Sequence, residues 1–103
     1  MNEAADSQMI RVTGGARIGR NRWLALNVTW PFAELDMTAD SLVLTAVWHY
    51  LRFRREDLES IEQCGSGVRF RHRVARYPRE VVFHCWNVPK LKRQLREFGY
   101  SIA

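Results

Sequence analysis

Hydrophobic and polar positions alternate along most of this chain. From Trp23 to Trp30, every second residue on one side is large and apolar, and this period of two is typical of a half-buried strand. A short apolar patch at residues 9–12 can pair at a sheet edge. The alternation predicts about seven further short strands, over residues 23–30, 33–37, 42–46, 48–54, 58–63, 68–74 and 81–86. The strand at 58–63 is expected to be bulged, because its two apolar residues are three positions apart.

Glycine and proline predict where these strands stop. Gly14 and Gly15 are adjacent and are expected to interrupt the chain. Pro31 has no N–H to give to a sheet, so it is expected to end the strand before it. The Gly65-Ser66-Gly67 segment is typical of a hairpin turn. These signals divide the chain into short antiparallel segments.

The period changes to about 3.6 after residue 86, which indicates a helix. Its apolar face is formed by Val88, Leu91, Leu95 and Phe98. Asn87 precedes the helix, and its side-chain oxygen suits an N-cap. Gly99 follows it and can adopt a positive φ at little cost. A helix this short is marginal alone, so its apolar face is expected to dock on the strands.

The order of strands followed by one helix predicts a mainly β protein, α+β by content. No crossover helices separate the strands, so antiparallel connections are favoured. Such a sheet has to curl or divide into two packed sheets to bury one face, and the terminal helix is expected to cover the open end. The 103 residues suit one domain over residues 9–103, preceded by a frayed polar tail at residues 1–8.

Composition narrows the class of protein. A net charge of +5 favours anionic partners or serves solubility alone. Cys64 and Cys85 lack the spacing of a zinc site or a disulfide framework, so both are expected to be buried free thiols. The amino-terminal segment lacks the pattern of a signal peptide, and no apolar stretch is long enough to span a bilayer. We therefore expect a cytoplasmic domain without metal or cofactor, possible at a membrane only as a peripheral protein.

Arginine is the most prominent candidate for chemistry. Alternating arginines place their guanidinium groups in a row about 6.6 Å apart, suited to phosphate or carboxylate oxygens. The anion-binding candidates are Arg52, Arg54, Arg69, Arg71, Arg73 and Arg76, with Arg55 and Arg79 close by. The alternative is a solvated strand face on which nearby glutamates pair with the arginines. Anionic lipid head groups and nucleic acid are the ligands that such a row would bind.

Aromatic residues provide candidates for contact with a partner protein. Trp30 and Phe32 flank Pro31 and either form an exposed apolar loop or fold back on the core; Tyr77 is a third candidate. The three histidines lie in strand patterns and are expected to be buried and hydrogen-bonded. No spacing joins a nucleophile, a base and an orienting acid, so no catalytic residue is assigned and we do not expect an enzyme.

Three segments carry a resemblance to a known superfamily. They are the hairpin at residues 33–44, the segment at 53–61, and the strand at 81–86 with the helix that follows. Together they resemble the pleckstrin-homology-like domains, above all the GRAM and small bacterial members, over residues 23–99. The resemblance implies a barrel of two orthogonal sheets capped by the helix. It also implies binding of phosphoinositides, other lipids or proteins, without catalysis.

Phosphoinositide-binding members of that superfamily carry basic residues in their first two strands. Residues 29–34 contain no Lys or Arg here, and Arg52-Phe53-Arg54 has the basic-x-Arg spacing only in a later strand. No family binding residue is therefore transferred to this chain. The sequence predicts a non-catalytic adaptor domain that binds a protein or peptide at an edge strand or an aromatic groove. The alternative is an anion-binding module that uses the arginine row.

Overall fold

The computed structural model describes residues 8–21 and 23–103, so most of the predicted tail and Arg22 lie outside the described residues. Seven strands form one antiparallel sheet in the order β4-β3-β2-β1-β7-β6-β5. Their bounds are Ile10–Gly19 (β1), Ala25–Met37 (β2), Ser41–Ala46 (β3), His49–Arg54 (β4), Leu58–Cys64 (β5), Gly67–His72 (β6) and Glu80–His84 (β7). A 3₁₀ turn, η1, spans Arg55–Asp57, and helix α2 spans Val88–Glu97.

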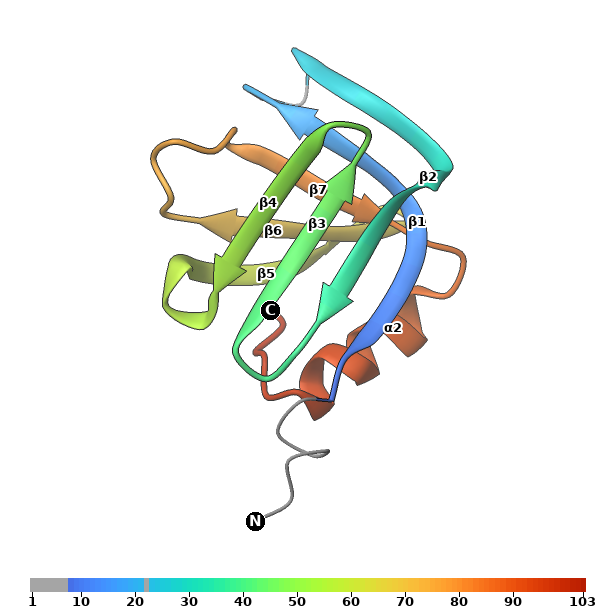
Figure 1. The fold of residues 1–103 in the computed structure, drawn as a ribbon, viewed down its shortest axis with the longest axis vertical. Helices are drawn as coiled ribbons and strands as arrows, with labels where there is room; N and C mark the ends of the chain where they lie inside the picture. Colours follow the sequence, from blue (N-terminus) through green and yellow to red (C-terminus); the bar gives the residue numbers. More distant parts are fainter. Residues whose placement is uncertain (1–7, 22) are drawn as a thin grey trace.

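The sheet curls into a half-barrel, so that β4 passes in front of β6 (Figure 1). Inward side chains from its two halves meet at the centre: the rings of Phe53 on β4 and Phe70 on β6 lie 6.1 Å apart. Leu91 and Leu95 of α2 are buried in the same core. The mainly β class, the antiparallel pairing and the C-terminal helix are thus confirmed. The sheet is continuous, and a division into two orthogonal sheets is not confirmed.

Strand β1 differs most from its prediction. It is ten residues long and lies inside the sheet between β2 and β7, whereas a short edge strand was expected. The glycine pair lies within it, because neighbouring backbone comes too close for a side chain. A Cβ on Gly14 would lie 2.0 Å from the carbonyl oxygen of His84. The glycines therefore permit close strand packing here and do not end the strand.

Pro31 does not end a strand either; it lies inside β2. Strand β1 pairs with β2 at residues 25–28 and 33–37, and β3 pairs with β2 only at 33–37. Residues 29–32 thus have no ladder partner among the described residues, so the missing N–H of Pro31 costs no sheet hydrogen bond. The first part of β2 projects beyond β3, at the top of Figure 1.

The remaining boundaries follow the predictions closely. The predicted bulge in β5 is confirmed by a register shift between Leu58 and Ser60. The Asn87 side chain accepts a hydrogen bond from the Lys90 N–H at 3.0 Å, and Gly99 has φ +92°. Both caps of α2 were therefore correctly predicted.

Two of the sheet edges are partly covered. The carboxyl-terminal residues lie along β5, where Ile102 bridges to Ile61 and the N–H of Ala103 donates to the Ile61 carbonyl at 2.8 Å. On β4, the N–H of Arg52 donates to the Tyr77 hydroxyl at 3.2 Å. The projecting part of β2 contrasts with both, because no strand pairs with its outer side among the described residues.

Candidate binding site

A cavity of about 370 Å³ lies where the projecting part of β2, the part of β1 at its register shift with β2, and the segment after β7 meet. We call it the tryptophan pocket. Its lining comprises Gly15 and Ala16 of β1, residues 27–30 of β2, Ser66, and residues 84–86. Apolar surface dominates the lining, and two tryptophan side chains form part of the wall. The pocket is thus built from four segments that are separate in the sequence.

Trp30 reaches the pocket because a register shift interrupts the pairing of β1 and β2. The pairing between β1 and β2 shifts between Gly14 and Ala16, and residues 29–32 are left over on the β2 side. A Cβ on Gly15 would lie 2.6 Å from the Val28 carbonyl oxygen and 3.2 Å from the Trp30 nitrogen. Glycine at position 15 therefore lets this part of β2 pass close to β1, which sets the position of the Trp30 wall.

Trp86 reaches the pocket from the short connection between β7 and α2. The backbone before it is held by a hydrogen bond from the Cys85 N–H to the Ser66 carbonyl at 3.3 Å, and the backbone after it is held by the Asn87 cap. The Trp86 side chain is 82% exposed, and its ring meets that of Trp30 edge-on at 5.9 Å. A large apolar ring held in water by a fixed backbone is a favourable element of a binding surface.

The polar groups of the pocket are held uncharged. The Ser66 hydroxyl and the Nδ1 atom of His84 lie 3.3 Å apart. Burial lowers the pKa of His84, and the positive charge of Arg17 lowers it further. Burial raises the pKa of the Cys85 thiol. At neutral pH the pocket therefore offers a neutral imidazole, a hydroxyl and a thiol beside its aromatic wall.

A second groove, of about 280 Å³, begins on the other side of Trp86. It lies between the first half of β1, at residues 11–13, and helix α2, where Lys90, Leu91 and Gln94 line it. Cys85 and Trp86 line both cavities, so the two form adjoining parts of one surface. Lys90 gives the second groove a positive charge.

The arginines of β6 are occupied by carboxylates. Arg69 donates to Glu62 at 3.3 Å and to Glu80 at 3.2 Å, and Glu80 also receives a hydrogen bond from Arg17 at 3.1 Å. Arg71 donates to Glu62 at 3.0 Å. Both line a cleft of about 390 Å³ whose wall includes Glu59 and Glu80 as well as two further arginines. For Arg69 and Arg71, the structure thus agrees with the alternative to an anion-binding row, in which the arginines pair with nearby glutamates.

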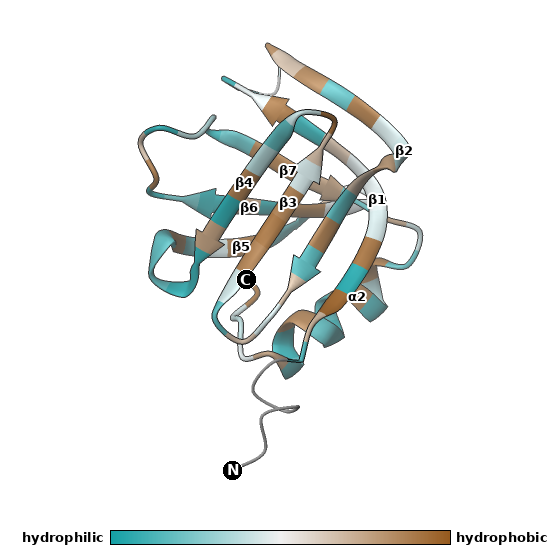
Figure 2. Cartoon of the chain, in the orientation of Figure 1, coloured by the Kyte–Doolittle hydropathy of each residue, from teal (hydrophilic) through white to brown (hydrophobic). Residues whose placement is uncertain are grey.

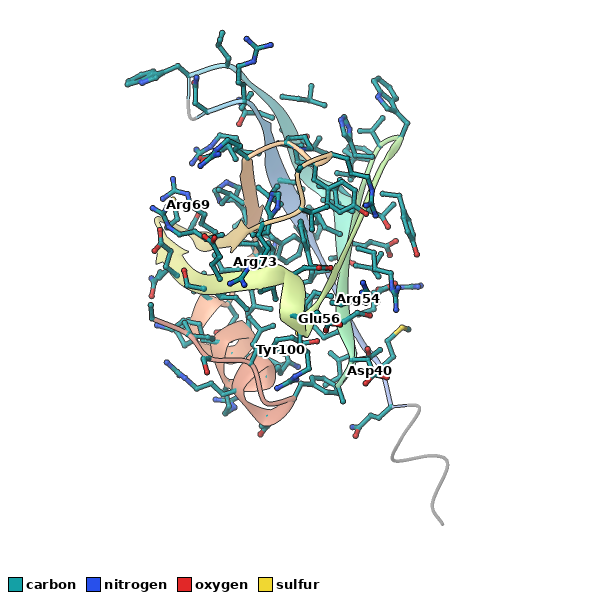
Figure 3. All side chains as sticks on the ribbon, turned by 90° about the vertical axis from the view of Figure 1, so that its left-hand side faces the viewer. Asp40, Arg54, Glu56, Arg69, Arg73 and Tyr100 are labelled. Carbon is teal, nitrogen blue, oxygen red and sulfur yellow. The ribbon has the colours of Figure 1, made fainter. Side chains whose placement is uncertain are left out.

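The arginines of β4 lie elsewhere. β4 and β6 are separated by four strands in the sheet order, and Figure 3 shows Arg54 and Arg69 on opposite sides of the molecule. Arg52, Arg54 and Arg76 line a cavity of about 400 Å³ together with Tyr50 and Tyr77. Arg73, just after β6, makes no ion pair with a described residue. The six candidates therefore do not form one row.

The aromatic candidates also differ in their surroundings. Trp30 is 50% exposed and Phe32 is 66% exposed, so neither folds back into the core. Tyr77 is half-buried, with its ring edge-on to Phe53 at 5.4 Å. Trp86 was not among the predicted contacts to a partner protein, because the alternation in 81–86 predicted a strand covered on both faces. β7 ends at His84, and Trp86 lies outside it.

The other chemical candidates are distributed as follows. His72 is half-buried and hydrogen-bonded to the Pro78 carbonyl at 2.7 Å, whereas His49 Nδ1 is buried without a described partner. The two cysteines are free and half-buried, where buried thiols were expected. Over residues 8–21 and 23–103, no three His, Cys, Asp or Glu side chains gather to hold a metal ion. Within the same residues, no helix has the length and apolarity to cross a membrane.

Comparison with protein-family models, with curated proteins and with solved structures finds no match to this chain.

Proposed function

We propose that this chain is a non-catalytic binding domain that holds an extended segment of a partner protein across the tryptophan pocket. The observation that carries the proposal is the pair of exposed rings of Trp30 and Trp86, in contact at the wall of an apolar cavity. Aromatic side chains of this kind supply large contact area at low entropic cost, and they are enriched at binding sites.

The state of His84 supports a binding role over catalysis. A histidine that acts as a general base has to become an imidazolium, and Arg17 disfavours that charge. The nearest hydroxyl, on Ser66, contacts the Nδ1 atom of His84. The carboxylate that lies closest to Arg17 is Glu80, which is already held by two guanidinium groups. The pair of Ser66 and His84 therefore suits a fixed polar contact to the backbone amide of a bound segment.

The adjoining groove indicates the character of the segment. An apolar side chain would fill the tryptophan pocket, and the chain would continue past Trp86 along α2. Lys90 lines this groove, and α2 as a whole is basic, with Lys90, Lys92, Arg93 and Arg96 against one acid, Glu97. A segment with an apolar residue followed by acidic residues therefore matches both the shape and the charge of this surface.

A displayed peptide library tests the proposal. The purified chain is used to select random twelve-residue peptides, and the binding of enriched peptides is measured by fluorescence polarisation. Trp30→Ala and Trp86→Ala should each weaken binding at least tenfold, because each removes an aromatic wall. Trp48→Ala is the matched control, since Trp48 is 81% exposed but lies outside the pocket. Enriched peptides that bind all three variants equally would exclude the pocket.

A second candidate function is an anion site at β4. Arg52 makes no ion pair with a described residue, Arg76 stacks on the Tyr77 ring at 5.0 Å, and the only carboxylate lining their cavity is Asp57. Vesicles containing phosphatidylserine and a single-stranded oligonucleotide are the two probes. Arg52→Glu with Arg76→Glu should abolish retention of either probe, and Arg71→Glu should not, because Arg71 is already paired with Glu62. Retention that does not fall with salt would contradict this candidate.

The pleckstrin-homology-like assignment, including the GRAM-like character, is part of the same proposal. It is supported by the curled antiparallel sheet and by the C-terminal helix packed into the core. The assignment further proposes that the strands divide into two orthogonal sheets, β1–β4 and β5–β7. An experimental structure in which β3 and β6 run nearly parallel would contradict it.

A further inference from the structure

The projecting part of β2, residues 25–32, has an open outer edge. We call this segment the β2 arm. β1 pairs with its inner edge at residues 25–28, and β3 begins its pairing only at Ala33. Figure 1 shows the arm extending past the β3–β4 turn with no ribbon beyond it. An unpaired edge of this length leaves backbone donors and acceptors available to another strand.

The hydrogen bonds of the hairpin show which backbone groups face outward. The Leu24 carbonyl accepts from the Arg20 N–H at 2.9 Å, so Leu24 faces β1. Backbone groups alternate in direction along a strand. The N–H and C=O groups of Ala25, Asn27 and Thr29 therefore point away from β1, toward the open edge.

The arm lacks the charged residues that normally protect an edge, and its one protecting residue, Pro31, lies beyond the outward-facing groups of residues 25–29. Proteins protect such strands with charges, above all lysine, but residues 23–33 contain no charged residue in a chain that is 26% charged. Leu24 is 62% exposed and Leu26 is 42% exposed. Figure 2 shows the hydrophobic colour along much of the arm. The edge is thus apolar and carries no charge of its own between residues 23 and 33.

We propose that the β2 arm pairs with the β2 arm of a second copy of this chain, forming a twofold dimer with one continuous sheet. Antiparallel pairing of identical strands is self-complementary about a twofold axis. A register centred on Asn27 uses the whole outward-facing set, because it pairs Ala25 with the second copy's Thr29. It also sets Leu26 opposite Val28 and Leu24 opposite Trp30, so apolar residues face apolar residues.

The small size of this strand contact predicts a weak dimer. A short strand pair with a few partly exposed apolar side chains buries less than the roughly 1,200 Å² of a stable interface. We therefore expect a reversible dimer with a dissociation constant on the order of 100 µM. The inference does not depend on the tryptophan pocket, because the edge and its hydrogen-bonding groups exist whether or not the pocket binds a ligand.

Sedimentation velocity between 10 and 500 µM (roughly five times the expected constant) tests the proposal. The wild-type chain should pass from 12.1 kDa toward twice that mass as concentration rises. Asn27→Lys and Asn27→Glu should each weaken association at least tenfold, since like charges would meet at the axis. An equimolar mixture of the two variants should restore the dimer. Thr45→Lys is the control, because β3 is paired on both sides.

Three outcomes would overturn the dimer. The first is a wild-type chain that stays monomeric at the highest concentration. The second is a mixture of the two Asn27 variants that stays monomeric although circular dichroism shows both are folded. The third is protection of the Ala25, Asn27 and Thr29 amides from hydrogen exchange only when a selected peptide is added, which would assign the edge to a foreign strand. The first two results leave the Trp86→Ala test of the proposed function unaffected, so the two proposals can fail separately.

Discussion

The guanidinium group of Arg55 lies over the ring of Tyr100, 4.7 Å from its centre. The same group donates to the Ala39 carbonyl at 2.9 Å, to the Phe98 carbonyl at 3.0 Å and to the Gly99 carbonyl at 2.6 Å. One side chain from η1 thereby joins the β2–β3 turn to the end of α2. The last carbonyls of a helix have no partner within the helix, so the hydrogen bonds from Arg55 stabilise the end of α2.

Replacing Arg55 by lysine should therefore destabilise the domain. The planar guanidinium of arginine directs several N–H donors at these three carbonyls, and the compact ammonium of lysine cannot reproduce that arrangement. We expect a loss of about 2 kcal/mol in the free energy of unfolding, measured by urea denaturation. Arg79→Lys, at an exposed arginine without an ion pair in the described chain, should change it by less than about 0.5 kcal/mol. Equal effects at both positions would show that the three hydrogen bonds contribute little.

Tyr100 should titrate late, with a pKa raised to about 12. Its hydroxyl donates to the Thr38 carbonyl at 2.8 Å, and burial raises its pKa to about 12, although Arg55 opposes the shift. Because the folded pKa lies above the unfolded value, this contribution to stability is present at neutral pH. It is lost as pH rises from about 10 toward 12. The absorbance of tyrosinate at alkaline pH should show one late step, which Tyr100→Phe removes.

Glu80 should make the domain sensitive to acid. Burial alone would raise the pKa of its carboxyl, but hydrogen bonds from Arg69 and Arg17 outweigh burial and lower it. Stability from this group is therefore present above the unfolded pKa of about 4.3 and is lost as pH falls through the lower folded value. Glu80→Gln should cost about 2 kcal/mol at pH 7, and the difference should shrink below about pH 4. Glu56→Gln, at an exposed side chain, should have little effect at either pH.

Gly15→Ala should damage both stability and the tryptophan pocket. The added Cβ would meet the Val28 carbonyl and the Trp30 nitrogen, and backbone atoms cannot yield as a flexible side chain does. We expect a loss of about 2 kcal/mol and weaker binding of any pocket ligand. Gly65→Ala is the control that separates a steric clash from the general cost of replacing glycine. A Cβ on Gly65 meets nothing within 4 Å, and only the positive φ of 58° costs energy there. A Gly15 variant that binds normally would show that the wall is not set by this approach.

Val47 should be replaceable with a gain in stability. It lies in the two-residue turn between β3 and β4 with φ +57°, which a β-branched residue adopts at a cost. Val47→Asn should raise the free energy of unfolding by about 0.5–1 kcal/mol, because asparagine tolerates that conformation. Thermal unfolding measures the change. Trp48→Asn in the same turn should give no gain, and an equal gain would point to lost surface hydrophobicity as the cause.

Local patterns sufficed for much of the fold. Alternation located the strands from Leu42 to Phe70, and the change of period located α2 with both of its caps. Sequence reasoning was wrong where a contact from a distant segment decided the outcome. Gly14 and Gly15 looked like a break, but the close approach of β7 and β2 requires glycine there. Pro31 was predicted to end a strand, but none of the described strands pairs with β2 at its position, so the missing N–H breaks no ladder there.

The candidate sites depended even more on long-range placement. The spacing of Arg69 and Arg71 predicted a row, and it could not show that Glu62 pairs with both guanidinium groups and Glu80 with that of Arg69. Nothing local distinguishes Arg54 from Arg69, although the curl of the sheet points them in opposite directions. Trp86 was not predicted as a partner contact, because its strand ends two residues earlier than the alternation indicates. Trp30 and Phe32 were found because an aromatic beside proline is a local signal.

Residues 27–30 form part of the pocket wall and also part of the open edge of β2. Two ligands that share a protein segment are thermodynamically linked, and each changes the affinity of the other by the same factor. A strand added to the edge would hold Trp30 in one position, so the pocket would lose less freedom when it is filled. Pairing of the β2 edge would thus change the affinity of the tryptophan pocket, and filling the pocket would change the affinity of the edge, through the four residues 27–30 that they share.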